Sequence, residues 1–327
     1  MIKSVSKILM SAAAATLIAS SAQAASNWVM ASGYADGNFM TQNIRQFIEE
    51  VKESTGGELD ITLHSNGTLI KLDGIRRAVQ RNQVQIGEIR LGSYSNEDPM
   101  YSLAAVPFLA PDYDSAWKLK DAQAPYFDKL FGETGLKVLA YQPWPGQGFY
   151  TKDPVNSTAD FEGKKLRIYS KPTQDMGNML GFNATILPFA EIPQAFATGL
   201  IEALFTSPQT GIDIQAWDNT SYFTYAGGLL SKNAIVVNQE AFDALPADVQ
   251  TALVKAGEAA SKRGWEMSKA TLEAQMGMLA EKGMTVTDAP EQVTAEMKKI
   301  GTKMLADWRA NASDEANKVV DVFLASQ

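Results

Sequence analysis

Two arginines stand in apolar segments of this sequence, and their side chains could bind an anion. Arg167 lies in the segment 163–169 between Leu166 and Ile168, so strand alternation puts its guanidinium on the face opposite those apolar side chains. Arg90 has the same character, in an apolar segment that ends in a glycine. A guanidinium offers a planar fork of donors that matches a carboxylate. The two positions therefore indicate a carboxylate site.

The alternative for each arginine is a structural ion pair with a carboxylate of the protein itself. Judged from spacing alone, this is the commoner role for an arginine in a half-buried strand. For Arg90 the obvious candidate is Glu88, which strand alternation places on the same face. The local sequence leaves both interpretations open for Arg90 and for Arg167.

Aromatic side chains gather in two segments that could line an organic ligand. Trp144 lies in 143–150, where two prolines and two glycines predict an irregular backbone. Trp217 follows the loop 206–208, and three more aromatic residues come shortly after it. Aromatic residues usually belong to a core, but on loops between lobes they could equally surround a ligand.

The composition argues against most other site chemistries. The chain has 327 residues, no cysteine and one histidine, His64. The lack of cysteine excludes disulfides, thiolate metal sites and cysteine catalysis. The single histidine nearly excludes histidine metal sites and Ser-His-Asp triads. We therefore expect no metal and no cofactor. The formal net charge of −8 argues against a nucleic-acid partner or an anionic membrane surface.

The first 24 residues have the pattern of a secretory signal peptide. Lys3 and Lys7 supply the positive start, 8–18 is an apolar run, and Ala22-Gln23-Ala24 is a small-x-small cleavage pattern. The run is shorter than the roughly 20 residues that span a bilayer. We expect export to the periplasm, and loss of both lysines would change the net charge from −8 to −10.

The elements that must position these residues alternate between strands and helices. Apolar residues at helical spacing predict helices over 40–51 and 70–80. The strands that the pattern predicts are 27–32, 59–63, 84–91, 136–141, 165–169, 184–187 and 203–206. Strands that alternate with helices in two successive sets predict an α/β fold divided into two lobes.

A long segment near the C-terminus predicts one exceptional helix. From 247 to about 282 there is no proline, and Gly257, Gly264 and Gly277 are isolated. A continuous helix of that length would extend roughly 50 Å, which is longer than one lobe is wide. It must either cross both lobes or break at a glycine, and we favour the helix that crosses both.

Several motifs, in their order and spacing, resemble those of the solute-binding proteins of tripartite ATP-independent periplasmic (TRAP) transporters. The resemblance extends over essentially the whole chain after the signal peptide. The segments that carry it are Asp160-Phe161-Glu162-Gly163-Lys164-Lys165-Leu166-Arg167-Ile168, Pro188-Phe189-Ala190-Glu191, Ala195-Phe196-Ala197-Thr198-Gly199-Leu200-Ile201-Glu202, Thr206-Ser207-Pro208, Val84-Gln85-Ile86-Gly87 and Val106-Pro107-Phe108.

The resemblance implies a two-lobed, type II-like periplasmic binding protein with a long helix spanning both lobes. Lobe I would comprise 25–144 plus about 233–272, and lobe II 145–232 plus about 273–327. It implies a monomer that is no enzyme, that captures a small organic acid between its lobes and that delivers it to TRAP membrane subunits. Arg167 would clamp the ligand carboxylate, and the whole predicted ligand-binding set is Arg167, Arg90, Gln147, Phe189, Thr206, Ser207, Trp144, Tyr34 and Trp217.

The identity of the acid is left open. A second arginine that the family uses for sialic acids aligns with Gln147, which cannot supply that charge. A dicarboxylate, a keto or hydroxy acid and an aromatic acid all remain compatible with the sequence. The rival functions are an exported hydrolase or lyase, for which Glu88, Glu191 and His64 are the candidate bases, and a sensor that presents its ligand to a membrane receptor.

Overall fold

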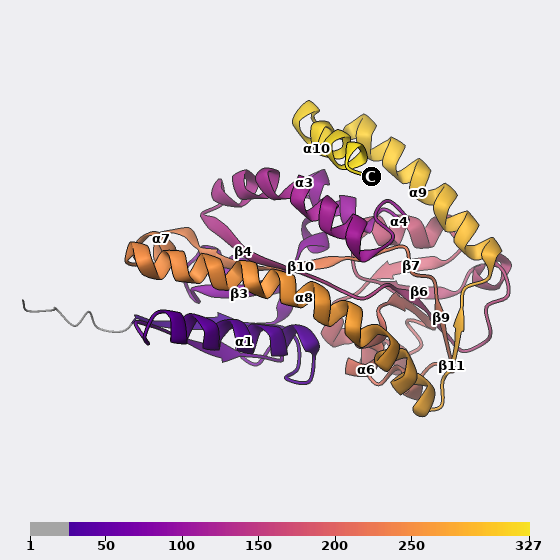
Figure 1. The fold of residues 1–327 in the computed structure, drawn as a ribbon. Helices are drawn as coiled ribbons and strands as arrows, with labels where there is room; N and C mark the ends of the chain where they lie inside the picture. Colours follow the sequence, from indigo (N-terminus) through magenta and orange to yellow (C-terminus); the bar gives the residue numbers. More distant parts are fainter. Residues whose placement is uncertain (1–25) are drawn as a thin grey trace, which may run out of the picture.

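Two β-sheets, each flanked by helices, make up the structure (Figure 1). It is a computed structural model and describes residues 26–327. The predicted signal peptide, 1–24, lies outside the described residues. The two sheets and their helices confirm the predicted α/β fold class.

The first sheet has five strands, and four of them come from the first half of the chain. Their spatial order is β2 (Leu59–His64), β1 (Ser26–Ala31), β3 (Ile86–Arg90), β10 (Lys232–Asn238) and β4 (Leu136–Pro143). β1 runs parallel to β2 and β3, whereas β10 is antiparallel to both of its neighbours. The chain therefore returns from the second half of the sequence to complete the first sheet.

The second sheet has six strands. Their order is β11 (Thr285–Asp288), β9 (Tyr222–Tyr225), β5 (Gly148–Thr151), β8 (Ala203–Thr206), β6 (Lys165–Ile168) and β7 (Asn183–Ile186). β6 lies parallel to β7 and β8, and β5 is antiparallel to β8 and β9. β5 lies inside the segment predicted to be irregular, but Trp144 follows β4 and stands in neither strand.

Helices cover the faces of the two sheets. They are α1 (Phe39–Ser54), α2 (Ile75–Gln80), α3 (Tyr113–Gly132), α4 (Lys171–Met179), α5 (Ile192–Ala197), α6 (Pro208–Asp213), α7 (Gln239–Asp243), α8 (Ala247–Glu281), α9 (Glu291–Asn311) and α10 (Asp314–Ala325). In residues 26–327, no helix combines the length and the apolar character that crossing a membrane requires.

The helix predicted over 40–51 forms as α1, and its periodic apolar side chains are buried. Asn38 caps it by accepting a hydrogen bond from the backbone N–H of Met40 at 2.9 Å. The helix predicted over 70–80 is shorter than expected. A 3₁₀ turn occupies Leu72–Gly74, and α-helical geometry begins only at Ile75.

The long helix α8 is continuous over 35 residues and crosses both sheets, as predicted (Figure 1). Its first half packs on α1 and β4, and its second half contacts α6 and β11. Leu253 belongs to the core beneath the first sheet, and Leu279 to a core of the second. One rigid element therefore joins the two halves of the molecule.

The last two helices return toward the first half of the chain. α10 packs on α3, and α9 contacts both α4 and the 3₁₀ helix Pro99–Ala105. The C-terminal helices thus contact both halves of the fold: α3 lies between β3 and β4 of the first sheet in the chain, and α4 lies between β6 and β7 of the second. The lobe boundaries given above stay a prediction.

Candidate functional site

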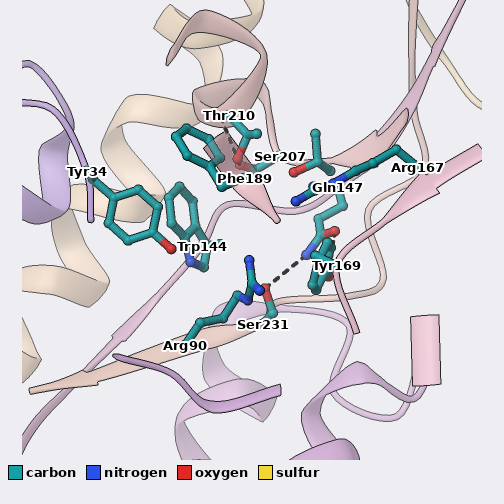
Figure 2. A pocket seen from close by; sticks show the side chains of 11 residues that line it. Tyr34, Arg90, Trp144, Gln147, Arg167, Tyr169, Phe189, Ser207, Thr210 and Ser231 are labelled. Atoms are coloured by element: carbon teal, nitrogen blue, oxygen red, sulfur yellow. Dashed lines mark hydrogen bonds between the residues drawn. The ribbon is translucent and has the colours of Figure 1, made fainter. Parts of the chain in front are cut away.

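A small cavity lies where the two sheets meet, and residues from both halves of the chain line it (Figure 2). The lining residues are Tyr34, Arg90, Trp144, Gln147, Arg167, Tyr169, Phe189, Thr206, Ser207, Thr210 and Ser231. Eight of the nine predicted site residues are in this set. Their proposed contact with a ligand stays a prediction.

Arg167 is the most deeply buried cation of the cavity, with 1% of its surface exposed. Its Nε and Nη2 donate to the Leu187 carbonyl oxygen at 3.1 and 2.9 Å. No ion pair joins it to a carboxylate anywhere in residues 26–327, so the structural ion pair considered above does not form there. Burial, together with the charge of Arg90, lowers the pKa of the guanidinium to about 9. Arg167 therefore stays protonated at neutral pH.

Arg90 reaches the same cavity from the end of β3. Its Nε donates to the Ser93 hydroxyl at 3.0 Å, and Nη2 lies 3.7 Å from a carboxylate oxygen of Asp73, which is half-exposed. The guanidinium carbons of Arg90 and Arg167 lie 5.6 and 5.9 Å from the centroid of the Tyr169 ring. Two cations thus face one aromatic ring, and Arg90 does not pair with Glu88.

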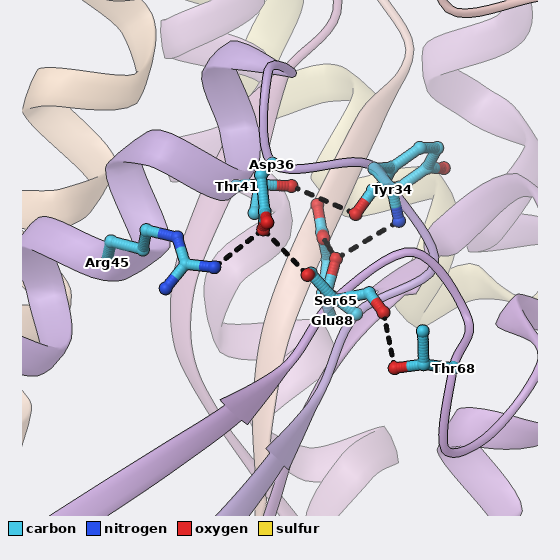
Figure 3. A network of polar contacts seen from close by, with 8 residues as sticks. Tyr34, Asp36, Thr41, Arg45, Ser65, Thr68 and Glu88 are labelled. Carbon is cyan, nitrogen blue, oxygen red and sulfur yellow. Dashed lines mark hydrogen bonds and ion pairs between the residues drawn. The ribbon is translucent and has the colours of Figure 1, made fainter.

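Glu88 has a different role, because it positions the aromatic part of the cavity. The buried carboxylate accepts hydrogen bonds from the Ser32 hydroxyl at 2.6 Å and from Asn233 Nδ2 at 2.9 Å. Asn233 Oδ1 in turn accepts from the Trp144 indole N–H at 2.9 Å. The Ser32 hydroxyl also accepts from the backbone N–H of Tyr34 at 3.3 Å (Figure 3). One buried carboxylate therefore orients two of the cavity's rings.

Glu88 also makes the stability of the protein depend on pH. Burial raises its pKa from 4.5 to about 7, even though two hydrogen bonds oppose the shift. Because the folded-state pKa is raised, the stability that protonated Glu88 contributes is complete below about pH 4.5 and is lost as the pH rises through about 7. We expect the free energy of unfolding to fall by about 3 kcal/mol over this range.

Urea denaturation at pH 4.5 and pH 8 checks this expectation in the wild type and in Glu88→Gln. The amide does not titrate, so the variant should lose the part of the pH dependence that Glu88 causes. Asp213 and the other titrating groups act equally in both proteins. The same pH dependence in both would show that the carboxylate is not responsible.

Three aromatic rings form one wall of the cavity (Figure 2). The Tyr34 ring meets the edges of Trp144 and Phe189 at centroid distances of 5.0 and 5.7 Å. Tyr34 and Trp144 follow strands of the first sheet, whereas Phe189 follows β7 of the second. The aromatic wall is therefore assembled from both halves of the molecule.

A polar chain forms another side of the cavity. The Tyr169 hydroxyl donates to Gln147 Oε1 at 2.8 Å, and Gln147 Nε2 donates to the Ser231 hydroxyl at 3.1 Å (Figure 2). Tyr169, Ser231 and Thr210 are lining residues that the sequence-based set lacks. Alternation from Arg167 points to Tyr169, which is two residues further on the same face, but no local signal marks Ser231.

Trp217 is the predicted site residue that does not line the cavity. It lies in the 3₁₀ helix Ala216–Asp218, and its ring packs against an apolar cluster of the second sheet. The Lys282 ammonium lies 5.6 Å from its ring centroid. Gln215, with a φ of 52°, turns the chain just before this helix, and Trp217 packs beside the end of α8.

Two sheets joined by a long helix, with a cavity between them that holds a buried cation without an ion-pair partner in residues 26–327, are typical of a two-lobed solute-binding protein. Residues 30–311 match the model of the bacterial extracellular solute-binding protein family 7, and the chain belongs to this family. The resemblance to TRAP solute-binding proteins is thereby confirmed. Within the described residues, no group of three or more histidine, aspartate or glutamate side chains could hold a metal ion.

The solved structures that are similar to this chain include those of two pyroglutamate-binding receptors. DctP7 of Bordetella pertussis, an extracytoplasmic solute receptor binding pyroglutamic acid, is 39% identical with a TM-score of 0.89, over 92% of this chain and 100% of the other. A marine metagenome TRAP protein specific for pyroglutamate is 34% identical with a TM-score of 0.88, over 92% and 99%. The 2,3-diketo-L-gulonate-binding periplasmic protein YiaO of Escherichia coli is 26% identical over 89% of this chain and 86% of the other.

Proposed function

We propose that this chain is the periplasmic solute-binding subunit of a TRAP transporter and that its ligand is pyroglutamate or a closely similar cyclic carboxylate. The observation that carries the proposal is Arg167, a buried guanidinium without a carboxylate partner in the described chain, set into a small cavity. Pyroglutamate as the acid is supported by the solved relatives at 34–39% identity, which bind pyroglutamate.

The ligand carboxylate binds on the side of Arg167 that faces the cavity. The Leu187 carbonyl oxygen already accepts hydrogen bonds from Nε and from one hydrogen of Nη2, and these two bonds fix the plane of the guanidinium. Its remaining donors are then presented without further loss of side-chain freedom. Arg90 adds a second positive charge across the Tyr169 ring, so the carboxylate lies in a locally positive field although the chain as a whole is acidic.

The ring of the ligand packs against the aromatic wall. Tyr34, Trp144 and Phe189 offer flat apolar surface, and Glu88 holds the first two in place through Ser32 and Asn233. The lining residues from both halves of the chain leave little free space between them. This size favours a compact cyclic acid over a longer chain.

The two lobes close around the ligand, and this closure encloses the cavity between them. Asn38 at the start of α1 donates to Asp213 at the end of α6 at 2.8 Å, and Tyr34 meets Phe189 nearby. These contacts join elements of the first sheet to elements of the second. They form only when the halves approach, so a ligand that bridges both halves stabilises the closed state.

The chain binds its ligand and does not convert it. It is exported by its signal peptide, works in the periplasm as a monomer, and releases the acid to the membrane subunits of the transporter. Incubation of the purified protein with pyroglutamate, followed by mass spectrometry, tests the absence of conversion. Recovery of the acid unchanged is expected, and a product that accumulates with time would contradict a pure binding role.

A thermal-shift series tests the proposed ligand. At 100 times its dissociation constant, L-pyroglutamate should add about 2.7 kcal/mol to the free energy of unfolding and raise Tm by several degrees. 2-Pyrrolidone lacks the carboxylate and should give no shift, because nothing then pairs with Arg167. L-Proline lacks the ring carbonyl and should give a smaller shift. A larger shift with a uronate or a C4-dicarboxylate than with pyroglutamate would contradict the assignment.

A further inference from the structure

Lys232, the first residue of β10, is a buried cation that the proposed function does not use. Only 4% of its surface is exposed, and its ammonium donates to Gln123 Oε1 at 2.6 Å. None of the ion pairs within residues 26–327 involves Lys232. An ammonium carries three donors, so two are left for another partner. Burial, together with the charge of Lys120, lowers its pKa to about 7.

Lys232 lines a second, small inner cavity that adjoins the ligand cavity. The two cavities share Arg90, Tyr169 and Ser231, which form their common boundary (Figure 2). Tyr101 also lines the inner cavity. Only 3% of the Tyr101 surface is exposed, and its buried hydroxyl has no hydrogen-bond partner in the described part of the chain. The inner cavity is thus lined by an ammonium that has one acceptor for its three donors and by a hydroxyl that has no partner in residues 26–327.

The charges around the two cavities do not balance. Arg167, Arg90 and Lys232 are cations, and within residues 26–327 their one ion pair is the long contact between Arg90 and the half-exposed Asp73. The carboxylate of Glu88 is occupied by its own hydrogen bonds to other side chains. A single ligand carboxylate next to the two arginines leaves Lys232 without a counter-charge, and a buried unpaired charge is costly. The lowered pKa of Lys232 reflects this cost, and an anion beside the ammonium would favour its charged form.

We propose that the inner cavity binds a small inorganic anion of halide size. The Lys232 ammonium and the Tyr101 hydroxyl hold it, and Arg90 at the boundary adds its positive charge. This anion is distinct from the carboxylate of the transported ligand, which lies at Arg167. The bound anion stabilises the folded protein, and Arg90 faces both anions.

Crystals of the full mature chain grown in sodium bromide provide the direct test. Data collected at the bromine edge should show an anomalous peak within hydrogen-bond distance of Lys232 Nζ in the wild type. The peak should be absent in Lys232→Met, or in Lys232→Gln if the methionine variant does not fold. Three results would overturn the proposal: no peak in the wild type, a peak that persists without the lysine, or a second carboxylate of an organic ligand in the inner cavity.

A titration in solution gives an independent readout. Raising sodium chloride from 5 to 150 mM should raise Tm of the wild type by several degrees more than that of Lys232→Met. The matched control is Lys137→Met on the neighbouring strand β4, whose lysine lies 5.3 Å from the Phe242 ring and outside both cavities. It should respond like the wild type. Equal responses in all three proteins would overturn the proposal. Neither test needs an organic ligand, so its outcome is independent of the pyroglutamate assignment.

Discussion

Replacing Arg167 by alanine is expected to weaken the binding of L-pyroglutamate at least about a hundredfold. Removing one partner of a buried, hydrogen-bonded charge pair costs about 3–5 kcal/mol, because the other charge is left desolvated and alone. The ligand carboxylate would lose its only fully buried cation in the cavity as the structure describes it, since Arg90 is less deeply placed and already contacts Asp73. Isothermal titration calorimetry measures the change in Kd.

The folded protein should survive this change. Arg167 makes no ion pair within residues 26–327, and burial lowers its pKa, so its charge is a cost to the unliganded state. The unliganded Arg167→Met variant should therefore unfold at a Tm no lower than that of the wild type, while its ligand-induced shift disappears. Arg167→Lys should also bind weakly, because an ammonium cannot make the planar two-point contact.

Arg263 offers a matched control. It lies on α8, where it bonds to Asn43 at 2.6 Å and pairs with Glu50 at 2.6 Å, away from the cavity. Arg263→Ala should lower Tm and leave Kd unchanged. If Arg167→Ala binds pyroglutamate within about tenfold of the wild type, the carboxylate is held elsewhere and the proposed clamp is wrong.

Gly257→Ala is expected to destabilise the protein by about 1–3 kcal/mol, although alanine is the better helix former. A Cβ at this position of α8 would lie 2.3 Å from the carbonyl oxygen of Leu139 and 2.9 Å from its carbonyl carbon. Both atoms belong to Leu139, a bulged residue of β4 whose neighbours Val138 and Ala140 pair with β10 and hold its backbone in place. The helix must move off the sheet to admit the methyl group. Thermal denaturation measures the loss.

The same helix contains its own control in Gly277. No atom of residues 26–327 lies within 4 Å of a Cβ built there, and the residue is exposed. Gly277→Ala should stabilise the protein by about 0.5–1 kcal/mol through helix propensity alone. A Gly257→Ala variant that matches Gly277→Ala in stability would show that α8 does not pack on β4 as closely as described.

The course of α8 shows how far a local pattern reaches. The absence of proline over 247–282 predicts one long helix, and the structure confirms it. The isolated glycines leave open whether the helix breaks there. Packing decides the matter, because Gly257 lets the helix approach β4, and Gly264 faces Asn43 of α1 and Gln142 of β4. Such contacts depend on chain segments more than 100 residues away.

Local sequence patterns also predict one part of the candidate site, and tertiary contacts decide the other. Alternation places Arg167 opposite its apolar neighbours, and its burial in a cavity agrees with that prediction. Alternation also places Arg90 and Glu88 on one face, but it does not show what each one meets. Glu88 finds its partners in Ser32 and Asn233, and the latter lies 145 residues away along the chain. Sheet register decided that pairing.

By itself the sequence determined local periodicities: the seven predicted strands, the helix over 247–282, and which face of a strand an arginine occupies, whereas β5, β9, β10 and β11 were not predicted. It also excluded thiol and most imidazole chemistry through composition alone. The resemblance assigns the segment after 233 to lobe I, but only the tertiary structure decided that β10 lies beside β3 and brings Ser231, Lys232 and Asn233 next to Arg90. The physical reason is that side-chain direction follows from the bonds of a few neighbouring residues, whereas the neighbours across a cavity follow from the packing of the whole chain.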